Sequence, residues 1–284
     1  MLYVVNYADG SLYEKYQKYC SLSARILGKA DKIVELKRND IDADYIKEHN
    51  NIFSYNRGAG LWLWKPYLID KTLNKIKDND WLFYTDSGSF FIRDIHKLIK
   101  CAEKNNTDIM LFEQPMLNRQ FCKKETAVLM GVEDKGENQT LGIMLIKKTE
   151  NTIGLIKEWK NMCQREELLS PKIFHPEIEE YKDFYEHRED QSIMSLLRTK
   201  YNILSFRDCS DYGVFPFDYY NPKWKYNPLK YNNSDYPTIL LCNRKCHPIK
   251  YLLLYFIKIV MKFFNVYTEE RKIKKVNKKF EYTR

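Results

Sequence analysis

The sequence predicts an α/β fold with a mixed, mostly parallel sheet that is flanked by helices. Over the first two-thirds of the chain, short apolar runs typical of strands alternate with longer stretches of helical spacing. Strands separated by helices form sheets that are covered on both faces. The 284 residues, of which 44% are hydrophobic and 15% aromatic, can bury a substantial core. Ligands of such sheets bind beyond the carboxyl ends of the strands, so we expect the site there.

The expected elements follow one another along the first 200 residues. Strands are predicted at 2–7, 32–36, 81–85, 109–112 and 142–147, and helices at 11–27, 42–49, 64–77, 92–104, 152–165 and 191–200. Pro66 lies near the first turn of its helix, where a missing N–H is harmless. Residues 208–237 are dense in Tyr, Pro, Asn and Asp, which predicts a long ordered loop that covers a site.

The net charge of +9 comes from the C-terminal segment. Residues 244–284 carry 12 basic and 3 acidic side chains, whereas residues 1–243 carry 35 of each. A neutral body argues against binding to DNA or RNA, and the basic residues follow an apolar stretch rather than interleaving with it. We therefore expect no nucleic-acid partner.

The chain is predicted to divide into a catalytic domain, residues 1–247, and a basic amphipathic tail, residues 248–284. The apolar stretch of the tail, 251–264, is shorter than the roughly 20 residues that span a bilayer, and it contains two lysines. Six of the nine residues 271–279 are basic. An interfacial helix followed by a polybasic segment favours binding to an anionic membrane surface. The alternative is a packed helix followed by a solvated tail.

The tripeptide Asp86-Ser87-Gly88 comes directly after the apolar run 81–85. A carboxylate at the end of a buried strand, followed by small residues, can approach a divalent cation and a diphosphate without steric hindrance. Mn²⁺ and Mg²⁺ prefer hard oxygen ligands and commonly bridge a carboxylate to substrate phosphates. The alternative is an ordinary turn, for which Asp, Ser and Gly are favoured residues.

Residues 57–66 read RGAGLWLWKP and precede a predicted helix. Glycines allow close approach of a ligand to the backbone, and a helix N-terminus favours phosphate. Arg57 and Lys65 can neutralise a phosphate charge. The alternative places the tryptophans in the core and the glycines in a loop.

Residues 187–197 read HREDQSIMSLL and open another predicted helix. Asp190 and Gln191 are candidate catalytic residues, because a carboxylate or an amide oxygen can orient an acceptor or stabilise an oxocarbenium-like transition state. The alternative is that Asp190 caps the helix. Glu113, which follows the predicted strand 109–112, is a candidate base that faces the acceptor.

The segments 57–68, 81–88 and 187–197, in this order and spacing, resemble bacterial GT-A glycosyltransferases of capsule and lipopolysaccharide assembly. The resemblance covers residues 1 to about 205 and implies a GT-A-like, Rossmann-type fold. It also implies a nucleotide-sugar donor, usually a uridine diphosphate sugar, with Mn²⁺ or Mg²⁺ as cofactor.

The resemblance assigns roles to individual residues. It implies that Asp86 is a metal ligand, with Ser87 and Gly88 beside it in the donor site, and that Lys65 is a donor-site cation. It places Asn6, Tyr7 and Ala8, after the first strand, against the nucleotide base. Asp190 and Gln191 are similar to the Asp-Gln pair of retaining galactosyl and glucosyl transferases, and Gln139–Ile143 corresponds to a small-residue strand at the sugar pocket.

Two features leave alternatives open. Gly88 stands where the family's Asp-x-Asp element carries a second carboxylate, so metal binding is weaker, completed by another residue, or dispensable. Late in the chain, His247 is a candidate additional metal ligand, and Arg244 and Lys245 are candidates for holding the diphosphate instead. Retention is favoured by the Asp-Gln resemblance, while inversion would need Glu113 or Asp190 as base.

The sequence thus predicts a glycosyltransferase that moves a sugar from a nucleotide diphosphate donor to a glycan or lipid-linked acceptor. We expect it in the cytoplasm, peripheral on the cytosolic face of the inner membrane, because no export signal is visible and the seven cysteines are odd in number and scattered. A non-catalytic glycan-binding or scaffold protein is the alternative. Nucleotidyl transfer is disfavoured, since Asn6–Gly10 lacks the glycine-rich loop with a cation that such enzymes carry after the first strand.

Overall fold

The computed structural model describes residues 1–243 and 246–281. Its strands are β1 (Leu2–Tyr7), β2 (Lys32–Leu36), β3 (Trp81–Tyr84), β4 (Ser89–Phe91), β5 (Ile109–Leu117), β6 (Asn138–Lys147), β7 (Ser205–Arg207) and β8 (Leu240–Cys242). Six of them form one sheet in the order β2-β1-β3-β6-β5-β7, and β4 pairs with β8. Within the large sheet only β6 runs antiparallel to its neighbours. The predicted α/β class with a mixed, mostly parallel sheet is confirmed.

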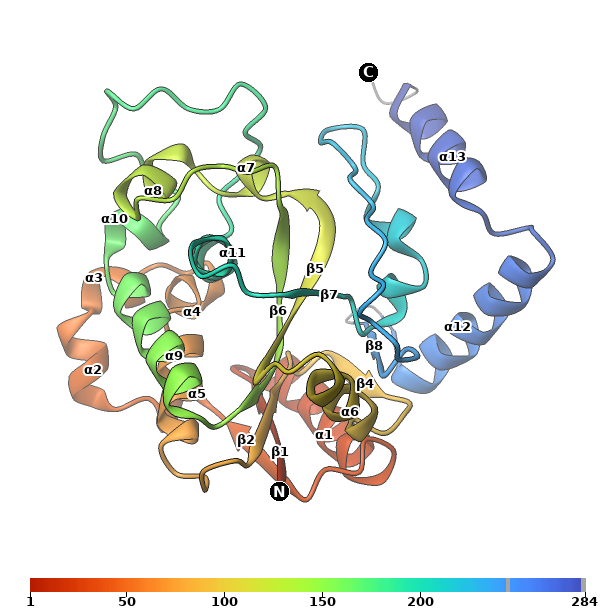
Figure 1. The fold of residues 1–284 in the computed structure, drawn as a ribbon, viewed down its shortest axis with the longest axis horizontal. Helices are drawn as coiled ribbons and strands as arrows, with labels where there is room; N and C mark the ends of the chain where they lie inside the picture. Colours follow the sequence, from red (N-terminus) through yellow and green to blue (C-terminus); the bar gives the residue numbers. More distant parts are fainter. Residues whose placement is uncertain (244–245, 282–284) are drawn as a thin grey trace.

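Helices cover both faces of this sheet (Figure 1). They are α1 (Ser11–Ile26), η1 (Arg38–Asp40), α2 (Ala43–Glu48), α3 (Asn50–Phe53), α4 (Gly58–Leu61), α5 (Trp64–Leu73), α6 (His96–Lys104), α7 (Asn118–Phe121), α8 (Lys124–Leu129), α9 (Glu150–Cys163), α10 (Glu166–Leu169), α11 (Glu189–Lys200), η2 (Asp211–Gly213), η3 (Pro216–Tyr219), α12 (Pro248–Phe263) and α13 (Glu269–Glu281).

Several boundaries differ from the sequence-based prediction. The helix expected from residue 92 begins at His96, because the backbone N–H groups of Ile92 and Arg93 both donate to the carbonyl of Ile239. The helix expected to reach residue 77 ends at Leu73. Strand β5 continues to Leu117, so Glu113 lies inside a strand rather than after it.

Alternating residues of the central strands build two separate cores. Leu82 and Tyr84 of β3 pack with the cluster that includes residues of α5 and α9, whereas Trp81 and Phe83 pack with the cluster that includes residues of α1 and α6. Figure 1 shows these two pairs of helices on opposite sides of the sheet. Because strand side chains alternate between faces, the unbroken apolar run of β3 is what a strand buried on both faces requires.

The path of the chain creates a crevice at one edge of the sheet. From β1 the chain crosses to β2 on one side and then returns to β3 on the other side of β1. β1 and β3 are parallel, so their carboxyl ends, Tyr7 and Tyr84, lie at the same edge. Ligands of α/β sheets bind at such a switch point.

The segment before α5 has an unusual backbone. Five consecutive residues, 58–62, have φ between 52° and 98°, and they include the non-glycine residues Ala59, Leu61 and Trp62. This left-handed conformation costs roughly 1–2 kcal/mol for each non-glycine residue. It is held by hydrogen bonds to the carbonyl of Gly58 from the Trp64 indole, at 2.9 Å, and from the Trp62 N–H, at 3.2 Å. Such strain is maintained where a site requires a particular backbone path.

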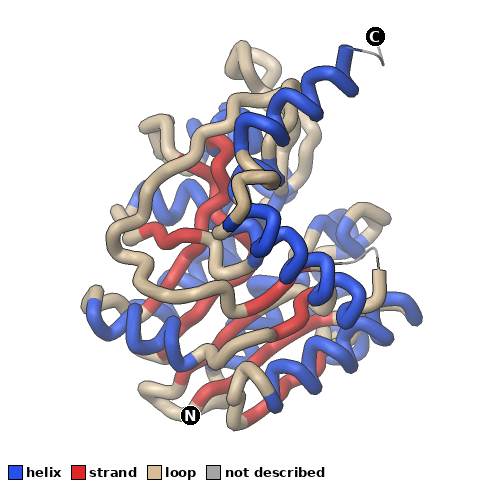
Figure 2. Tube along the Cα trace, turned by 90° about the vertical axis from the view of Figure 1, so that its right-hand side faces the viewer, coloured by secondary structure: helices blue, strands red, loops and turns tan. Residues whose placement is uncertain are grey.

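The C-terminal helices lie outside the sheet (Figures 1 and 2). Tyr255 of α12 is buried against Phe215, Phe217 and Leu241. In the described ranges, no helix combines the length and the apolar character that crossing a membrane requires.

Gly60→Ala tests the left-handed segment. Gly60 has φ 98°, and an added Cβ would lie 2.7 Å from Cδ1 and 3.0 Å from Cα of Phe53. We expect the free energy of unfolding to fall by about 2–4 kcal/mol in chemical denaturation. The control is Gly154→Ala in α9, where nothing lies within 4 Å of the added Cβ. This control should raise the free energy of unfolding by up to about 1 kcal/mol. Equal effects of the two changes would contradict the claim that the left-handed backbone requires glycine at position 60.

Candidate active site

The carboxyl end of β3 opens into a cavity of about 550 Å³, whose wall includes Asp86 and Gly88 just after the strand. All three motif segments contribute to its wall, although they lie far apart in the sequence. The lining residues are Arg57, Trp62, Lys65, Asp86, Gly88, Ser89, Leu141, Gly142, Ile143, Arg188, Glu189, Asp190, Gln191, Tyr212, Tyr219, Cys242, Asn243 and Tyr251. The structure therefore brings the predicted residues of these segments to one place.

A second cavity of about 430 Å³ adjoins the first, and Asp86 and Trp62 line both. Its other lining residues are Tyr7, Asp9, Tyr13, Asn56, Gly58, Ala59, Trp64 and Ser87. The Tyr7 ring stacks on Trp64 with centroids 3.7 Å apart. The wall thus combines aromatic rings with a left-handed backbone, and Asp86 stands between the two cavities.

Of the three residues predicted to lie against a nucleotide base, only Tyr7 lines this second cavity. The Asn6 side chain is fully buried and donates to Ser21 Oγ at 3.2 Å. Ala8 is also buried, and its N–H donates to the carbonyl of Leu36 at 3.0 Å. Both residues therefore fix the end of β1 behind the cavity wall.

A buried ion pair joins two motif segments in the first cavity. Lys65 Nζ lies 2.7 Å from Asp190 Oδ2, and each side chain is 4% exposed. Burial raises the pKa of Asp190, and the positive charge of Lys65 opposes that rise. The indole of Trp159 donates to the Asp190 carbonyl at 3.0 Å. Asp190 is held by Lys65 and does not cap α11, so the alternative interpretation as a helix cap is wrong.

Gly142 of β6 makes room for this arrangement. A Cβ at this position would lie 3.0 Å from Lys65 Nζ and 3.7 Å from Gln191 Nε2. The Gln191 amide donates to the carbonyl of Thr140 at 3.3 Å. The strand predicted to line a sugar pocket therefore lies against both Lys65 and Gln191, and a side chain at Gly142 would crowd the Lys65 ammonium group.

The first turn of α11 contributes two cavity residues that the sequence reasoning did not assign. Glu189 is buried, has φ 38° and lies 2.6 Å from Arg57 Nε. Burial raises the pKa of Glu189 to about 7, and Arg57 partly offsets this. Arg188 lies over the Phe121 ring at 4.2 Å and donates to Gln114 Oε1 at 3.0 Å. The sequence offered one signal for assigning them to the site, since both are charged and stand next to Asp190 in the motif 187–197.

Further unassigned wall residues come from the loop region 208–237, from the end of β8 and from the tail. Tyr212, Tyr219, Cys242, Asn243 and Tyr251 all line the first cavity. Tyr212 and Tyr219 lie within the segment 208–237 that the sequence predicted to cover a site, but no spacing pattern distinguished them from its other tyrosines.

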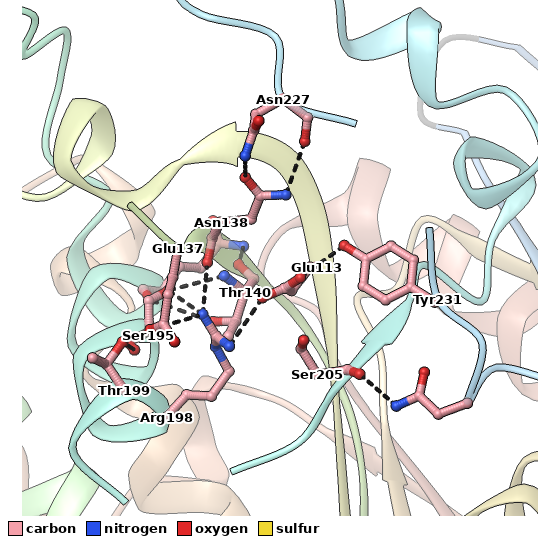
Figure 3. A network of polar contacts seen from close by, with 12 residues as sticks. Glu113, Glu137, Asn138, Thr140, Ser195, Arg198, Thr199, Ser205, Asn227 and Tyr231 are labelled. Carbon is pink, nitrogen blue, oxygen red and sulfur yellow. Dashed lines mark hydrogen bonds and ion pairs between the residues drawn. The ribbon is translucent and has the colours of Figure 1, made fainter. Parts of the chain in front are cut away.

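Glu113, predicted as a base, does not line either cavity. Figure 3 shows it in a buried network between β5, β6 and α11. Its carboxylate lies 3.0 Å from Arg198 Nη1 and accepts a hydrogen bond from the Tyr231 hydroxyl at 2.7 Å. Arg198 also contacts Glu137 at 3.3 Å and the Asn138 carbonyl at 3.2 Å. This position corrects the prediction, because the carboxylate is committed to holding α11 against the sheet.

Of the late candidates, His247 caps α12 through Nδ1, which accepts from the Ile249 N–H. Its Nε2 lies 3.2 Å from the Tyr19 hydroxyl, and the residue does not line either cavity. Arg244 and Lys245 lie outside the described residues. Among the residues that are described, no group of three or more His, Cys, Asp or Glu side chains could hold a metal ion.

Comparison with known proteins gives structural similarity only. No protein-family model and no curated protein matches this chain. Apo mouse xyloside xylosyltransferase 1 is similar at 11% identity over 86% of this chain and 98% of its own, with a TM-score of 0.45. The galactosyltransferase LgtC with donor and acceptor sugar analogues is similar at 14% identity over 87% of each chain, with a TM-score of 0.43.

The apo bifunctional glycosyltransferase WbbM is similar at 11% identity over 69% of this chain and 37% of its own, with a TM-score of 0.40. All three structures are glycosyltransferases by name. At these identities and TM-scores the similarity carries no conclusion about activity, which has to come from the site.

Glu113→Ala tests the structural role of the buried network. Without Glu113, the positive charge of buried Arg198 loses its closest ion-pair partner, so we expect the free energy of unfolding to fall by about 3–5 kcal/mol. Glu103→Ala, an exposed change in α6, is the control and should stay within about 0.5 kcal/mol. If Glu113 were a catalytic base instead, Glu113→Gln would abolish turnover and leave the free energy of unfolding unchanged.

Proposed function

We propose that this chain transfers a sugar from a nucleotide diphosphate donor, with a uridine diphosphate sugar as the expected donor, to a glycan or lipid-linked acceptor. The observation that carries the proposal is the pair of adjoining cavities with Asp86 at their junction. A nucleotide sugar has a planar base at one end, a sugar at the other and a diphosphate between them. The two cavities offer matching chemistry in the same order.

The second cavity suits the nucleoside. Tyr7, Tyr13 and Trp64 give it aromatic surface on which a base can stack, and Asp9 adds a carboxylate acceptor for ribose hydroxyls. Gly58 and Ala59 expose backbone on the same wall. These contacts are largely preformed, which reduces the entropy lost when a flexible donor binds.

The junction suits the diphosphate and a divalent cation. Asp86 is followed by the small residues Ser87 and Gly88, so a phosphate can come close to its carboxylate. Among the carboxylates of the two cavities, Asp86 lines both, whereas Glu189 and Asp190 line only the first. This set fits Mn²⁺ or Mg²⁺ that is bound through one carboxylate and the substrate phosphates. The cation would neutralise the charge of the departing nucleoside diphosphate.

The first cavity suits the transferred sugar. Asp190 and Gln191 lie on one wall, where Lys65 fixes the carboxylate and Thr140 fixes the amide. In the reaction, the bond from the anomeric carbon to the diphosphate breaks and a bond to an acceptor hydroxyl forms. We include retention of configuration in the proposal. An inverting reaction needs a carboxylate base at the acceptor, but Glu113 is buried elsewhere and Asp190 is held by Lys65.

Asp86→Ala tests the proposed donor site. The wild type is incubated with Mn²⁺ and a panel of nucleotide sugars, and donor hydrolysis and protection against heat are measured. Loss of the junction carboxylate should lower hydrolysis of the accepted donor by at least about 100-fold, since the diphosphate charge is then less well neutralised. Asp235→Ala removes an exposed carboxylate outside both cavities and should change nothing.

Two results would overturn the proposal. One is that no nucleotide sugar protects or reacts with the wild type. The other is that Asp86→Ala reacts at the wild-type rate. Binding of glycans without any response to nucleotides would favour the alternative, a glycan-binding or scaffold protein.

We further propose that the tail attaches the protein to an anionic membrane surface, on the cytosolic face of the inner membrane. Apolar side chains form one exposed stripe along α12: Ile249, Leu253, Phe256, Ile257, Val260 and Phe263. Phe263 is 80% exposed and Phe264 beside it is 67% exposed. The following helix α13 carries the basic cluster 271–279 and has no buried residue. An apolar stripe next to clustered positive charge complements an anionic lipid surface.

Replacing Phe263 and Phe264 together by serine tests the membrane proposal. Vesicles of phosphatidylcholine with about one-third phosphatidylglycerol are floated with the protein. Each buried Phe contributes on the order of 1.5–3 kcal/mol, so vesicle binding by the variant should fall at least about tenfold. Val128→Ser, an exposed apolar change in α8, is the control. Equal binding by the double variant, or equal binding to pure phosphatidylcholine, would contradict the proposal.

A further inference from the structure

One wall of the first cavity is built from three tyrosines that belong to none of the motifs. Tyr212 comes from η2, Tyr219 from η3 and Tyr251 from α12. All three are half-buried, so part of each ring faces open space. The Tyr212 and Tyr219 rings lie against each other with centroids 4.5 Å apart. Two of the rings thus lie against each other, and Tyr251 adds a third ring to the lining of the same cavity.

Two of the hydroxyl groups are held behind the wall. The Tyr251 hydroxyl donates to Asp211 Oδ2 at 2.7 Å, and the other oxygen of that carboxylate accepts from the Cys242 N–H at 3.0 Å. The Tyr219 hydroxyl donates to Asp208 Oδ2 at 3.1 Å. Both carboxylates are buried. Because these hydroxyls are committed, Tyr219 and Tyr251 offer the cavity the apolar part of their rings in fixed positions.

The chemistry of this wall differs from that of the motif residues. Asp190 and Gln191 offer polar groups that suit the hydroxyls of a sugar. The tyrosines offer aromatic carbon, which suits the apolar C–H face of a pyranose ring. A phosphate, a carboxylate or an extended acyclic chain would gain little from such a surface. A cavity of about 550 Å³ lies between these walls.

We propose that Tyr212, Tyr219 and Tyr251 form the acceptor subsite and that it takes a neutral pyranose ring. The inference rests on the proposed function, because it assigns the polar part of the same cavity to the donor sugar. It also gives the tail helix a part in acceptor choice. Tyr251 is supplied by α12, which is seated by Tyr255 against Phe215, Phe217 and Leu241.

The experiment uses the full chain with the donor that it hydrolyses and, as acceptor probes, methyl glycosides of glucose, galactose, mannose and N-acetylglucosamine. Glycerol serves as an acyclic polyol. Saturation-transfer NMR with uridine diphosphate and diamagnetic Mg²⁺ present reports which probe touches the protein, and initial rates give KM for acceptor and donor separately. We expect at least one pyranoside to give strong saturation of its ring protons, while glycerol gives none.

Paired variants separate ring contact from folding. Tyr212→Ala should raise the acceptor KM about tenfold more than the donor KM, whereas Tyr212→Phe, which keeps the ring, should stay within about threefold of wild type. Tyr251→Ala repeats the alanine test for the residue from α12. Tyr201→Ala, which removes an exposed tyrosine outside both cavities, is the control.

The outcomes distinguish the subsite from the underlying activity. If the donor is hydrolysed but the alanine variants leave the pyranoside signal and the acceptor KM unchanged, the subsite is wrong while the transferase proposal stands. Equal saturation of glycerol and pyranosides also overturns the subsite. If no donor reacts and yet pyranosides lose their signal in the alanine variants, the sugar subsite stands and the transferase proposal fails.

Discussion

The buried ion pair between Lys65 and Asp190 is the interaction on which the site depends. It joins residues 125 positions apart, and both side chains are almost completely removed from water. Removing one partner of such a pair leaves an uncompensated charge, which costs about 3–5 kcal/mol. The chain therefore cannot bury either motif segment without the other. Gly142 completes the arrangement, because any larger side chain would meet Lys65 Nζ.

Hydrophobic patterning was enough to predict five of the six strands of the large sheet, because apolar runs of strand length are recognisable from sequence. The three-residue strand β7 is too short to show such a pattern. The same pattern predicted that the site lies at the carboxyl ends of the strands, since Asp86 comes directly after an apolar strand. Glu113 shows the limit of this reasoning. A carboxylate at the end of an apolar run looks the same whether it serves catalysis or an ion pair, and its partner Arg198 is 85 residues away. Tyr251 was missed for the same reason, since only packing of α12 brings it to the cavity.

The tail helix α12 has two faces with different surroundings, which its composition alone did not distinguish. Its apolar content led to two alternative interpretations, a surface-binding helix or a packed helix. In the structure α12 packs one face through Tyr255 and leaves the other exposed. The packed face explains how Tyr251 reaches the cavity, and the exposed face is the surface that the membrane proposal concerns. The two roles are compatible because side chains four residues apart, such as Tyr251 and Tyr255, share one face of a helix.

The proposed role of Asp86 as a metal ligand depends on the residues around it more than on the tripeptide Asp86-Ser87-Gly88. Gly88 stands where a fuller acidic element would carry a second carboxylate, and Asp86 is the carboxylate that lines both cavities. A divalent cation held mainly by Asp86 would be weakly bound to the protein alone, because such ions need several oxygen ligands. Donor phosphates would supply the missing ligands. Under the proposed function, cation and donor would therefore bind jointly at Asp86, and the small residues Ser87 and Gly88 would give the phosphates access.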